Sequence, residues 1–497
     1  MKTALSILAC LALASTPRCI AQTTILREVN QLEHQGRFSQ AATVLRGAIT
    51  NAPPLGPDRR QLEFELARLR RIRLDFPLTR ESLYAELKAH VRRLTRSEFE
   101  TWVEQGRFDS REIDGKRYFM VASVSNLFFR YPELNSRRLP PKDTSGRQNA
   151  IWQTCRAIHQ AAQEQQTPLV LPKTFRVTMN VTAAPGAAPD GETIRAWLPV
   201  PRHYPYQRDF RLLNTSSPLK HLDGKESPIR SVYLEQTAHA GEPTRFTICY
   251  EYTRWGVSFN LNPSFIHAAD PNDPALKPFL AQGPHVVFTP AIRALSKELA
   301  DKQSNPMLKA KAFYDWIGSH IKYSYAIEYS TIRNISDYCL THRYGDCGQE
   351  ALLFITLCRL NGIPARWQSG WNTFPGGKDI HDWTEIYLAP YGWVPVDPYM
   401  SVFAGQYATS LTPRQRHEVC DFYFGGMDQY RIAANSAHNQ TLTPPKESMR
   451  SDNVDFQRGE LEWDSHNIYF DKYSYGLTIQ EVNPGPEPGP QSGAIQP

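Results

Sequence analysis

Apolar residues recur with helical spacing over the first part of the chain. Ile25, Val29 and Leu32 lie at positions i, i+4 and i+7, and later apolar stripes keep the same period. Gly36 separates the first two stripes, which predicts two short helices like one tetratricopeptide-type hairpin. The later stripes share no common repeat length. We therefore predict a helical region over 22–168 and no repeat array.

After Pro172 the apolar residues alternate with polar ones, which is the period of a strand with one buried face. The alternating segments are 173–182, 194–201, 231–237 and 244–254. Proline, glycine and aspartate residues between the first two segments supply turns. The pattern predicts a small antiparallel β domain, sandwich-like, over 172–262.

Helical spacing returns at 289–302 and 306–321, and a polar segment rich in tyrosine follows at 322–343, where we expect a long loop. Two alternating stretches, 381–388 and 393–396, are joined by a turn with proline and glycine, which predicts a β-hairpin. A chain of 497 residues is too long for one hydrophobic core. We therefore predict a multidomain α+β protein.

The N-terminal residues predict an export signal. A short positive start and an apolar run from Ala4 to Ala14 are followed by small residues up to Ala21. We expect removal of 1–21 and a periplasmic or secreted protein. Too little apolar sequence precedes Cys10 for a lipoprotein signal, so we expect no lipid anchor. No later segment has 18 uninterrupted apolar residues, and we expect no stable membrane insertion.

Charge and cysteine content limit the partners and cofactors. The formal net charge of +6 is small, and the basic residues are scattered among acids, which argues against a nucleic-acid partner. Of eight cysteines, two lie within 1–21 and six remain, too few for a disulfide scaffold, although one or two disulfides could form. The six are Cys155, Cys249, Cys339, Cys347, Cys358 and Cys420. They form no CxxC pair and no histidine cluster accompanies them, so we expect no metal and no other cofactor.

Cys347 is the first candidate for chemistry. Gly345 and Gly348 flank it, and the apolar residues after it keep helical spacing, which places the thiol at a helix N-terminus. The unpaired N–H groups and the helix dipole there should favour a thiolate and lower the thiol pKa. The same N–H groups could stabilise an oxyanion. The alternative is a small buried hydrophobe, which the glycines and the preceding Asp346 do not favour.

His381 begins the first strand of the predicted hairpin, and Asp397 follows the second strand. The return of the hairpin should bring Asp397 close to His381. Together with Cys347, these residues satisfy the requirement for a nucleophile, a base and an orienting acid, and we predict them as the catalytic residues. Asp382 competes for the orienting role, but on a strand it should point to the face opposite His381.

Several neighbouring residues have a structural interpretation. One cysteine, one histidine and one aspartate at long spacings lack the paired spacing of metal ligands. We expect a structural ion pair for Arg366 and a core position for Cys358, three helical turns after Cys347. Trp371 and Trp383 could line a cleft, but a core position is favoured.

Four blocks of the sequence, in this order, resemble the transglutaminase-like superfamily of cysteine enzymes. The blocks are Tyr344-Gly345-Asp346-Cys347-Gly348, Asn361-Gly362-Ile363-Pro364-Ala365-Arg366, His381-Asp382-Trp383-Thr384-Glu385-Ile386-Tyr387-Leu388 and Tyr391-Gly392-Trp393-Val394-Pro395-Val396-Asp397-Pro398. The resemblance implies a papain-like α+β core with Cys347 as nucleophile, His381 as general base and acid, and Asp397 as its orienter. We place this catalytic domain at 285–405, followed by a C-terminal extension over 406–482. A disordered tail of alternating proline and glycine is expected at 483–497.

The resemblance also implies a reaction at amide bonds of proteins or peptides through a thioester. Gly348 stands where animal crosslinking members of the family carry tryptophan, so we expect hydrolysis rather than crosslinking. The alternative is a non-catalytic scaffold that binds other proteins through the N-terminal helices. The substrate, the oligomeric state and the acyl acceptor, water or an amine, stay open.

Overall fold

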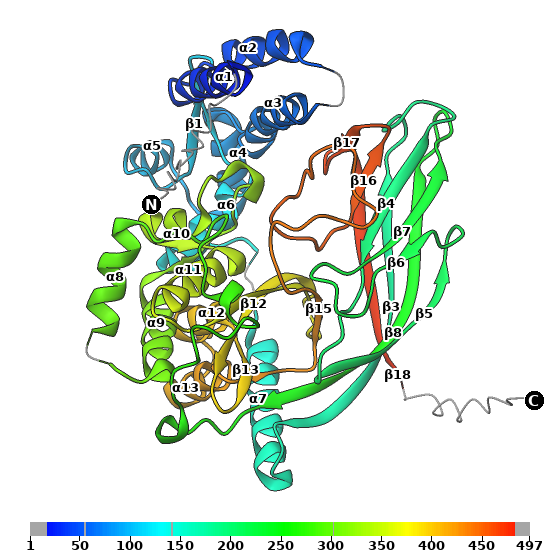
Figure 1. Ribbon diagram of the computed structural model, residues 1–497. Helices are drawn as coiled ribbons and strands as arrows, with labels where there is room; N and C mark the ends of the chain where they lie inside the picture. The colour runs from blue at the N-terminus through cyan, green and yellow to red at the C-terminus, as the bar shows by residue number, and fades with distance from the viewer. Residues whose placement is uncertain (1–16, 54–55, 141–142, 302, 483–497) are drawn as a thin grey trace, which may run out of the picture. The chain divides into compact units, whose positions relative to one another are not determined.

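A computed structural model describes residues 17–53, 56–140, 143–301 and 303–482 (Figure 1). Most of the predicted export signal and the predicted tail lie outside these residues. The first described helix begins at Pro17 and therefore includes the predicted cleavage site at Ala21. The chain divides into two compact units, one made of residues up to 84 with 108–121, and one made of 85–107 with the residues from 122 onward.

The first unit combines helices with one β-hairpin. Its elements are α1 (Pro17–His34), α2 (Phe38–Asn51), α3 (Pro57–Asp75), the start of α4 (Arg80–His90), β1 (Ser110–Ile113) and β2 (Lys116–Phe119). The predicted break between the first two helices is confirmed, because Gly36 has a φ of 73° there. Val29, Leu45 and Leu69 are buried between the helices. Arg68 forms an ion pair with Glu33, and both side chains are buried.

A β-sandwich lies in the second unit, after helices α5 (Arg96–Glu104), α6 (Ser123–Arg130), η1 (Pro132–Arg137) and α7 (Ser145–Gln165). One sheet has the order β14 (Gly426–Met427), β8 (Thr244–Ser258), β3 (Leu169–Ala183), β18 (Tyr473–Val482), with β5 (Gln207–Thr215) also paired to β8. The other has the order β17 (His466–Ile468), β16 (Glu460–Trp463), β4 (Thr193–Pro199), β7 (Ser231–Thr237), β6 (His221–Leu222). Val177, Ile248, Leu198 and Leu234 meet in one apolar cluster between the sheets. The four predicted strands and the sandwich are confirmed.

The C-terminal segment is integrated into these sheets. Strands β14, β16 and β18 follow residue 405 in sequence, yet they pair with β8, β4 and β3, and β17 pairs with β16. The segment predicted as an extension therefore completes the sandwich, and the β domain is not confined to 172–262. The short strands gave no clear alternation in the sequence, and long-range pairing decides their place.

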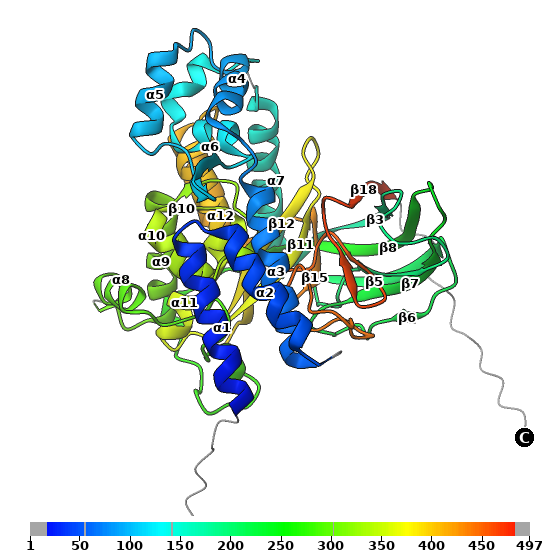
Figure 2. The same ribbon diagram turned by 90° about the horizontal axis from the view of Figure 1, so that it is seen from above.

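The second half of the unit is an α+β core around a sheet with the order β13 (Gly392–Val396), β12 (Asp379–Leu388), β11 (Ala365–Asn372), β15 (Arg431–Asn435). Figure 2 shows α11 (Cys347–Leu360) beside this sheet. Leu352 and Ile355 of α11 pack in one cluster with Phe313 of α9 (Pro306–His320) and Trp367 of β11. Helix α8 (Pro290–Ala300) joins the same cluster, and η2 (Pro263–Phe265) and η3 (Lys277–Phe279) precede it.

The predicted loop over 322–343 is wrong in part. It contains β9 (Lys322–Tyr323), η4 (Tyr329–Thr331) and α10 (Ile335–His342), and β10 (Tyr344–Gly345) follows. The Asn334 side chain caps α10, and Ile335 and Cys339 pack into the core. After the hairpin come α12 (Pro398–Val402), the π-helix η5 (Phe403–Tyr407) and α13 (Pro413–Phe422).

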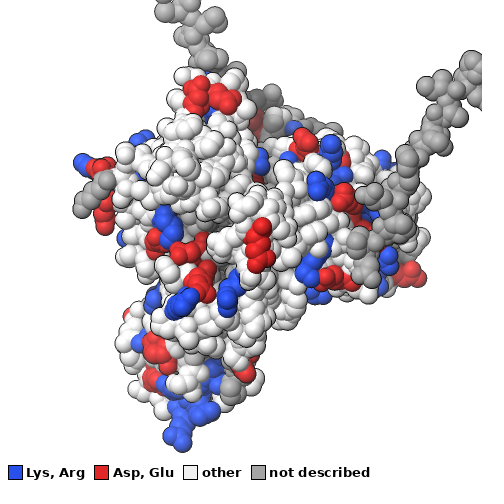
Figure 3. All heavy atoms as spheres, turned by 90° about the horizontal axis from the view of Figure 1, so that it is seen from below, with Lys and Arg blue, Asp and Glu red and all other residues white. Residues whose placement is uncertain are grey.

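The surface carries charges of both signs. On the face drawn in Figure 3, acidic and basic side chains lie interspersed. Among the described helices, none combines the length and the apolar character needed to span a bilayer.

Candidate active site

Cys347 is the first residue of α11, as the flanking glycines predicted. Asp346 caps the helix, since its Oδ1 accepts the Gln349 N–H at 3.2 Å, while Gln349 Oε1 accepts the Asp346 N–H at 3.3 Å. The Tyr329 hydroxyl donates to the same Asp346 oxygen at 2.5 Å. Cys347 is half-buried, and its side chain reaches a cleft. The capping residues therefore fix where the thiol stands.

His381 is paired with Asp397 rather than with Asp382. Its Nε2 lies 2.8 Å from Asp397 Oδ2, and both side chains are buried. Burial alone would raise the pKa of Asp397, but His381 and the Arg431 guanidinium outweigh it and hold the pKa below its ordinary value. The carboxylate is thus ionised and can only accept, so Nε2 donates and Nδ1 keeps the free lone pair.

Arg431 of β15 continues this chain of contacts into the interior. Its Nη1 lies 3.0 Å from Asp397 Oδ2, and its Nε lies 3.2 Å from Asp428 Oδ2. The guanidinium is 1% exposed, so the two buried carboxylates are compensated by a buried cation. The ring of Tyr399 approaches His381 from another side, with ring centroids 5.5 Å apart.

The thiol of Cys347 faces Asp382 in this structure. Its Sγ lies 3.9 Å from Asp382 Oδ2, and the sulfur also interacts with the Asp382 backbone N–H. Among the described residues, no hydrogen bond joins Cys347 to His381. Burial, together with the carboxyl groups of Asp382 and Asp346, raises the pKa of Cys347 well above its usual value. The expectation of a lowered thiol pKa is therefore wrong, because burial and nearby carboxyls oppose the helix N-terminus.

Asp382 is held against the start of α11 by neighbours from three segments. A Cβ at Gly348 would lie 2.6 Å from Asp382 Oδ2 and 2.2 Å from the Tyr329 hydroxyl, so only glycine fits there. Gln457 Nε2 donates to Asp382 Oδ1 at 2.8 Å. Burial raises the pKa of Asp382 well above its usual range, and a neutral carboxyl can donate a hydrogen bond.

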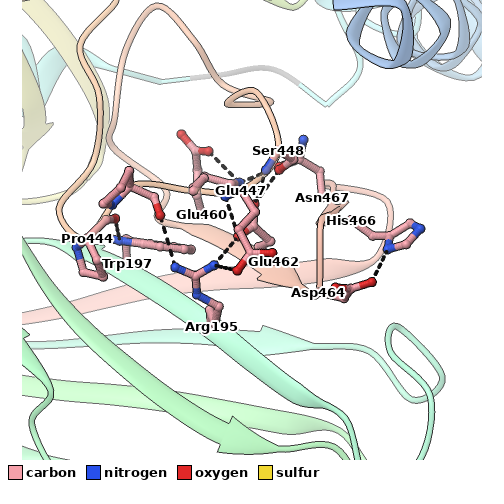
Figure 4. Close-up of polar contacts among 12 residues, drawn as sticks. Arg195, Trp197, Pro444, Glu447, Ser448, Glu460, Glu462, Asp464, His466 and Asn467 are labelled. Atoms are coloured by element: carbon pink, nitrogen blue, oxygen red, sulfur yellow. Dashed lines mark hydrogen bonds and ion pairs between the residues drawn. The ribbon is translucent and has the colours of Figure 1, made fainter. Parts of the chain in front are cut away.

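Gln457 comes from a long loop, 436–459, that runs between β15 and β16. Figure 4 shows how the loop is fastened to the sandwich. The Trp197 indole N–H donates to the Pro444 carbonyl at 2.9 Å, and Arg195 contacts Glu447 at 3.0 Å (Figure 4). Ser448 N–H donates to Glu462 of β16 at 3.0 Å. These contacts hold the loop so that its last residues reach the cleft at Cys347.

The cleft has a volume of about 200 Å³. It is lined by Tyr323, Tyr325, Ala326, Ile327, Glu328, Tyr329, Asp346, Cys347, Asp379, Ile380, Asp382, Asp455, Gln457 and Arg458. A larger cavity of about 480 Å³ lies between α7 and α13, around Cys155 and His159. It includes none of the predicted catalytic residues, so the smaller cleft is the candidate active site.

The sequence-based assignments of Arg366, Cys358, Trp371 and Trp383 are confirmed. Arg366 forms an ion pair with Glu385, Nε to Oε2, at 2.7 Å. Cys358 is fully buried in the core, and Trp371 and Trp383 are buried as well. All six cysteines from Cys155 to Cys420 are free thiols. Among the described residues, no group of three or more histidine, cysteine or acidic side chains is arranged to hold a metal ion.

Several residues of the site had no signal in the sequence. Arg431, Asp455 and Gln457 follow the catalytic motifs by many residues and lie in a segment with no clear period. Tyr329 lies in the segment expected as a loop. The backbone pairing of β11 with β15 places Arg431 behind Asp397, and the anchoring of the loop 436–459 brings Asp455 and Gln457 to the cleft at Cys347.

Residues 293–398 match the model of the transglutaminase-like superfamily, and this segment is a transglutaminase-like domain. The uncharacterized protein YebA of Bacillus subtilis is 30% identical over 22% of this chain and 17% of its own length. An uncharacterized protein of Haemophilus influenzae is 22% identical over 38% of this chain and 58% of its own length. The chain thus covers less than two thirds of either relative.

Solved structures are similar at lower identity. A "Putative Cysteine Protease" from Cytophaga hutchinsonii is 17% identical with a TM-score of 0.42, over 64% of this chain and 93% of that one. The periplasmic domain of TgpA from Pseudomonas aeruginosa is 17% identical with a TM-score of 0.26, over 53% of this chain and 96% of that one.

Proposed function

We propose that this protein is an exported thiol enzyme that hydrolyses amide bonds of proteins or peptides, with Cys347, His381 and Asp397 as catalytic residues. The observation that carries the proposal is the buried His381–Asp397 pair, 2.8 Å apart, in the same domain as a half-buried cysteine at a helix N-terminus. The transglutaminase-like domain over 293–398 supports a cysteine enzyme.

The reaction begins with a proton transfer. His381 Nδ1 accepts the proton of the Cys347 thiol as the sulfur attacks the amide carbonyl carbon, and the carbonyl oxygen becomes an oxyanion. The thiol faces Asp382 in this structure. The proton transfer therefore requires the side chain of Cys347 to turn toward His381 when the substrate binds. The raised pKa of the thiol makes this base necessary.

The tetrahedral intermediate formed by this attack then breaks down. The N–H groups of the first turn of α11 donate to the oxyanion. The C–N bond breaks, His381 returns its proton to the leaving nitrogen, and a thioester remains on Cys347. Water attacks the thioester while His381 takes a proton from it, and that proton returns to the sulfur as the acid leaves. Asp397 keeps His381 in one tautomer throughout.

The test is a mass-spectrometric survey of products from a peptide library incubated with the full chain. We expect cleaved or deamidated peptides, and a loss of at least about 10³-fold in rate for Cys347→Ser. Cys249→Ser, a half-buried cysteine on β8, is the matched control and should keep full activity. Retained activity in Cys347→Ser, or products made only when an amine is added, would contradict the proposal.

A further inference from the structure

A closed ring of buried contacts lies behind the His381–Asp397 pair. Asp397 Oδ2 lies 2.8 Å from His381 Nε2 and 3.0 Å from Arg431 Nη1. On the other side of the guanidinium, Arg431 Nε donates to Asp428 Oδ2 at 3.2 Å. The Tyr423 hydroxyl donates to the same Asp428 oxygen at 2.8 Å. The Tyr423 carbonyl accepts the Asp397 N–H at 3.0 Å, so the contacts return to Asp397 and close the ring.

Arg431 is held in place by this ring and by two aromatic faces. Its guanidinium carbon lies 5.6 Å from the centre of the Tyr423 ring and 5.8 Å from the centre of a Trp383 ring. Asp428 is fixed as well, because its Oδ1 accepts the Tyr430 N–H at 2.8 Å. The side chains of Arg431 and Asp428 are each 1% exposed. The interior of the fold therefore keeps one cation beside Asp397.

Stability alone does not account for this arrangement. The replacement of a buried ion pair by apolar groups of similar volume is often neutral or stabilising. Arg431 Nη1 is close to Asp397, yet the contact does not have the geometry of a hydrogen bond. Arg431 therefore acts on Asp397 through its charge.

The other titratable side chains that interact with Asp397 belong to three elements packed around it. They are Glu350 of α11, Tyr314 of α9 and Tyr399 of α12. Burial raises the pKa of each of these three groups, which favours the neutral form. Arg431 therefore supplies the positive charge beside Asp397 whenever His381 is neutral.

Three further groups interact with the partners of Asp397. Cys155 of α7 and Arg254 of β8 interact with Arg431, and Asp379 of β12 interacts with His381. Burial raises the pKa of Cys155 well above its ordinary value, which favours the neutral thiol. All three groups are retained in the variants below, so a comparison among those variants isolates the ring around Arg431.

We propose that Arg431 is a positioning residue of the reaction, which acts through Asp397 on His381 while Asp428 holds it in place. The inference rests on the proposed function. The Asp397 carboxylate attracts the imidazolium form of His381, and the Arg431 guanidinium at the same oxygen weakens this attraction. His381 therefore stays neutral, and able to accept the Cys347 proton, at a lower pH than Asp397 alone would allow.

The experiment is the profile of kcat/KM against pH for the full chain with a peptide that it cleaves. Arg431→Gln removes the cation and should move the acid limb about one pH unit to higher pH. KM should change little, because Arg431 lies behind Asp397 and not in the cleft wall. Arg431→Lys keeps a charge and should return the limb to within about 0.3 of a pH unit of wild type.

Asp428→Asn covers the case in which Arg431→Gln does not fold. It removes the carboxylate that competes with Asp397 for Arg431, while the amide oxygen can still accept from Nε. The acid limb should therefore move in the opposite direction, by about half a pH unit to lower pH.

Arg68→Gln is the matched control. Arg68 of the first unit is also buried between two acids, with its Nη2 2.5 Å from Glu33 Oε2 and its Nε 2.9 Å from Glu65 Oε2. The substitution should lower the stability of the protein as a buried ion pair does. It should leave the profile of kcat/KM against pH unchanged.

A spectroscopic arm separates this inference from the proposed function. In the Cys347→Ala chain with isotope-labelled histidine, the ring resonances report the protonation of His381 without turnover, and His381→Gln identifies its signal. The midpoint of this titration should move about one pH unit higher in Arg431→Gln and return in Arg431→Lys. These shifts without any peptide hydrolysis would refute the proposed function and leave the role of Arg431 standing. Unchanged midpoints in Arg431→Gln and Asp428→Asn, or a move to lower pH in Arg431→Gln, would overturn the inference.

Discussion

The two walls of the cleft differ in how the chain specifies them. One wall consists of the starts of α11 and β12, and short local motifs determine it. The other consists of the end of the loop 436–459, which reaches the site only through its contacts with the sandwich (Figure 4). The first wall holds the predicted reactive groups, and the second holds Asp455, Gln457 and Arg458. Local sequence motifs determine the first wall, whereas the second depends on long-range folding.

The walls also differ in their electrostatics. Behind the first wall the charge of Asp397 is compensated, because the carboxylate is paired with His381 and Arg431. At the second wall carboxyl groups are buried without enough cations, and burial raises the pKa of Asp455 to about 6. The pKa of Asp346, across the cleft, is raised to about 6 as well, again mainly by burial. The charged form of Asp397 is therefore favoured in the folded protein, whereas the charged forms of Asp455 and Asp346 are disfavoured.

The largest expected effect is at Arg431. The substitution Arg431→Met leaves the buried carboxylates of Asp397 and Asp428 without their cation, and we expect a loss of about 3–5 kcal/mol in the free energy of unfolding. Arg211→Met is the control, because Arg211 is 53% exposed in its ion pair with Glu251 and should contribute about 0–1 kcal/mol. Urea unfolding followed by tryptophan fluorescence measures both. Equal losses in stability for Arg431→Met and Arg211→Met would contradict the expectation that a buried cation between two carboxylates contributes more than an exposed ion pair.

A smaller effect is expected at Gly348, in the first turn of α11. A Cβ there would lie 2.2 Å from the Tyr329 hydroxyl and 2.6 Å from Asp382 Oδ2. We expect Gly348→Ala to destabilise the fold by about 1–3 kcal/mol and to lower peptide hydrolysis, because Tyr329 and Asp382 must move. Gly476→Ala on β18, with open space around its Cβ, should do neither. Full activity in Gly348→Ala would show that the contacts of Asp382 with the helix start are dispensable.

The smallest expected effect is a gain in the free energy of unfolding, and it concerns Asp455. The raised pKa of Asp455 means that its charged form is disfavoured in the folded state, so wild-type stability should fall as the pH rises from about 4 to about 6. Asp455→Asn should therefore be more stable than wild type by about 1–2 kcal/mol at pH 7, with no difference below pH 4. Asp382, Asp452, Glu328 and Arg458 surround the group and are unchanged in the variant. A lower stability of Asp455→Asn than of wild type at pH 7 would contradict this prediction. It would mean that the neighbouring groups stabilise the charged carboxylate of Asp455 in the folded protein.

The sequence predicted the elements whose signals are local. The helix after Cys347, the hairpin that returns Asp397 to His381, and the four long sandwich strands all follow from spacing and turn residues. The helix α10 was hidden because its eight residues lie in a polar segment. Strands β14, β16 and β18 were missed because their partners β8, β4 and β3 lie more than a hundred residues away. Arg431 carries no motif, and only the pairing of β15 with β11 places it behind Asp397.

The protonation state of Cys347 could not be predicted either. Helix position favours a thiolate, but the structure adds burial and two carboxyl neighbours, Asp382 and Asp346, which oppose it. Those neighbours depend on how Tyr329 and Gln457 hold the carboxyl groups. No local motif contains that information.

The most direct test of the proposed chemistry is the mass of the covalent intermediate. After rapid acid quenching of the chain with a reactive peptide ester or amide, intact mass spectrometry should show one added acyl group. Peptide mapping should locate it on the segment that contains Cys347, and Cys347→Ala should show none. The His381→Ala variant should form the adduct far more slowly. No adduct under turnover, or an acyl group on a different cysteine, would contradict the assignment of Cys347 as the nucleophile.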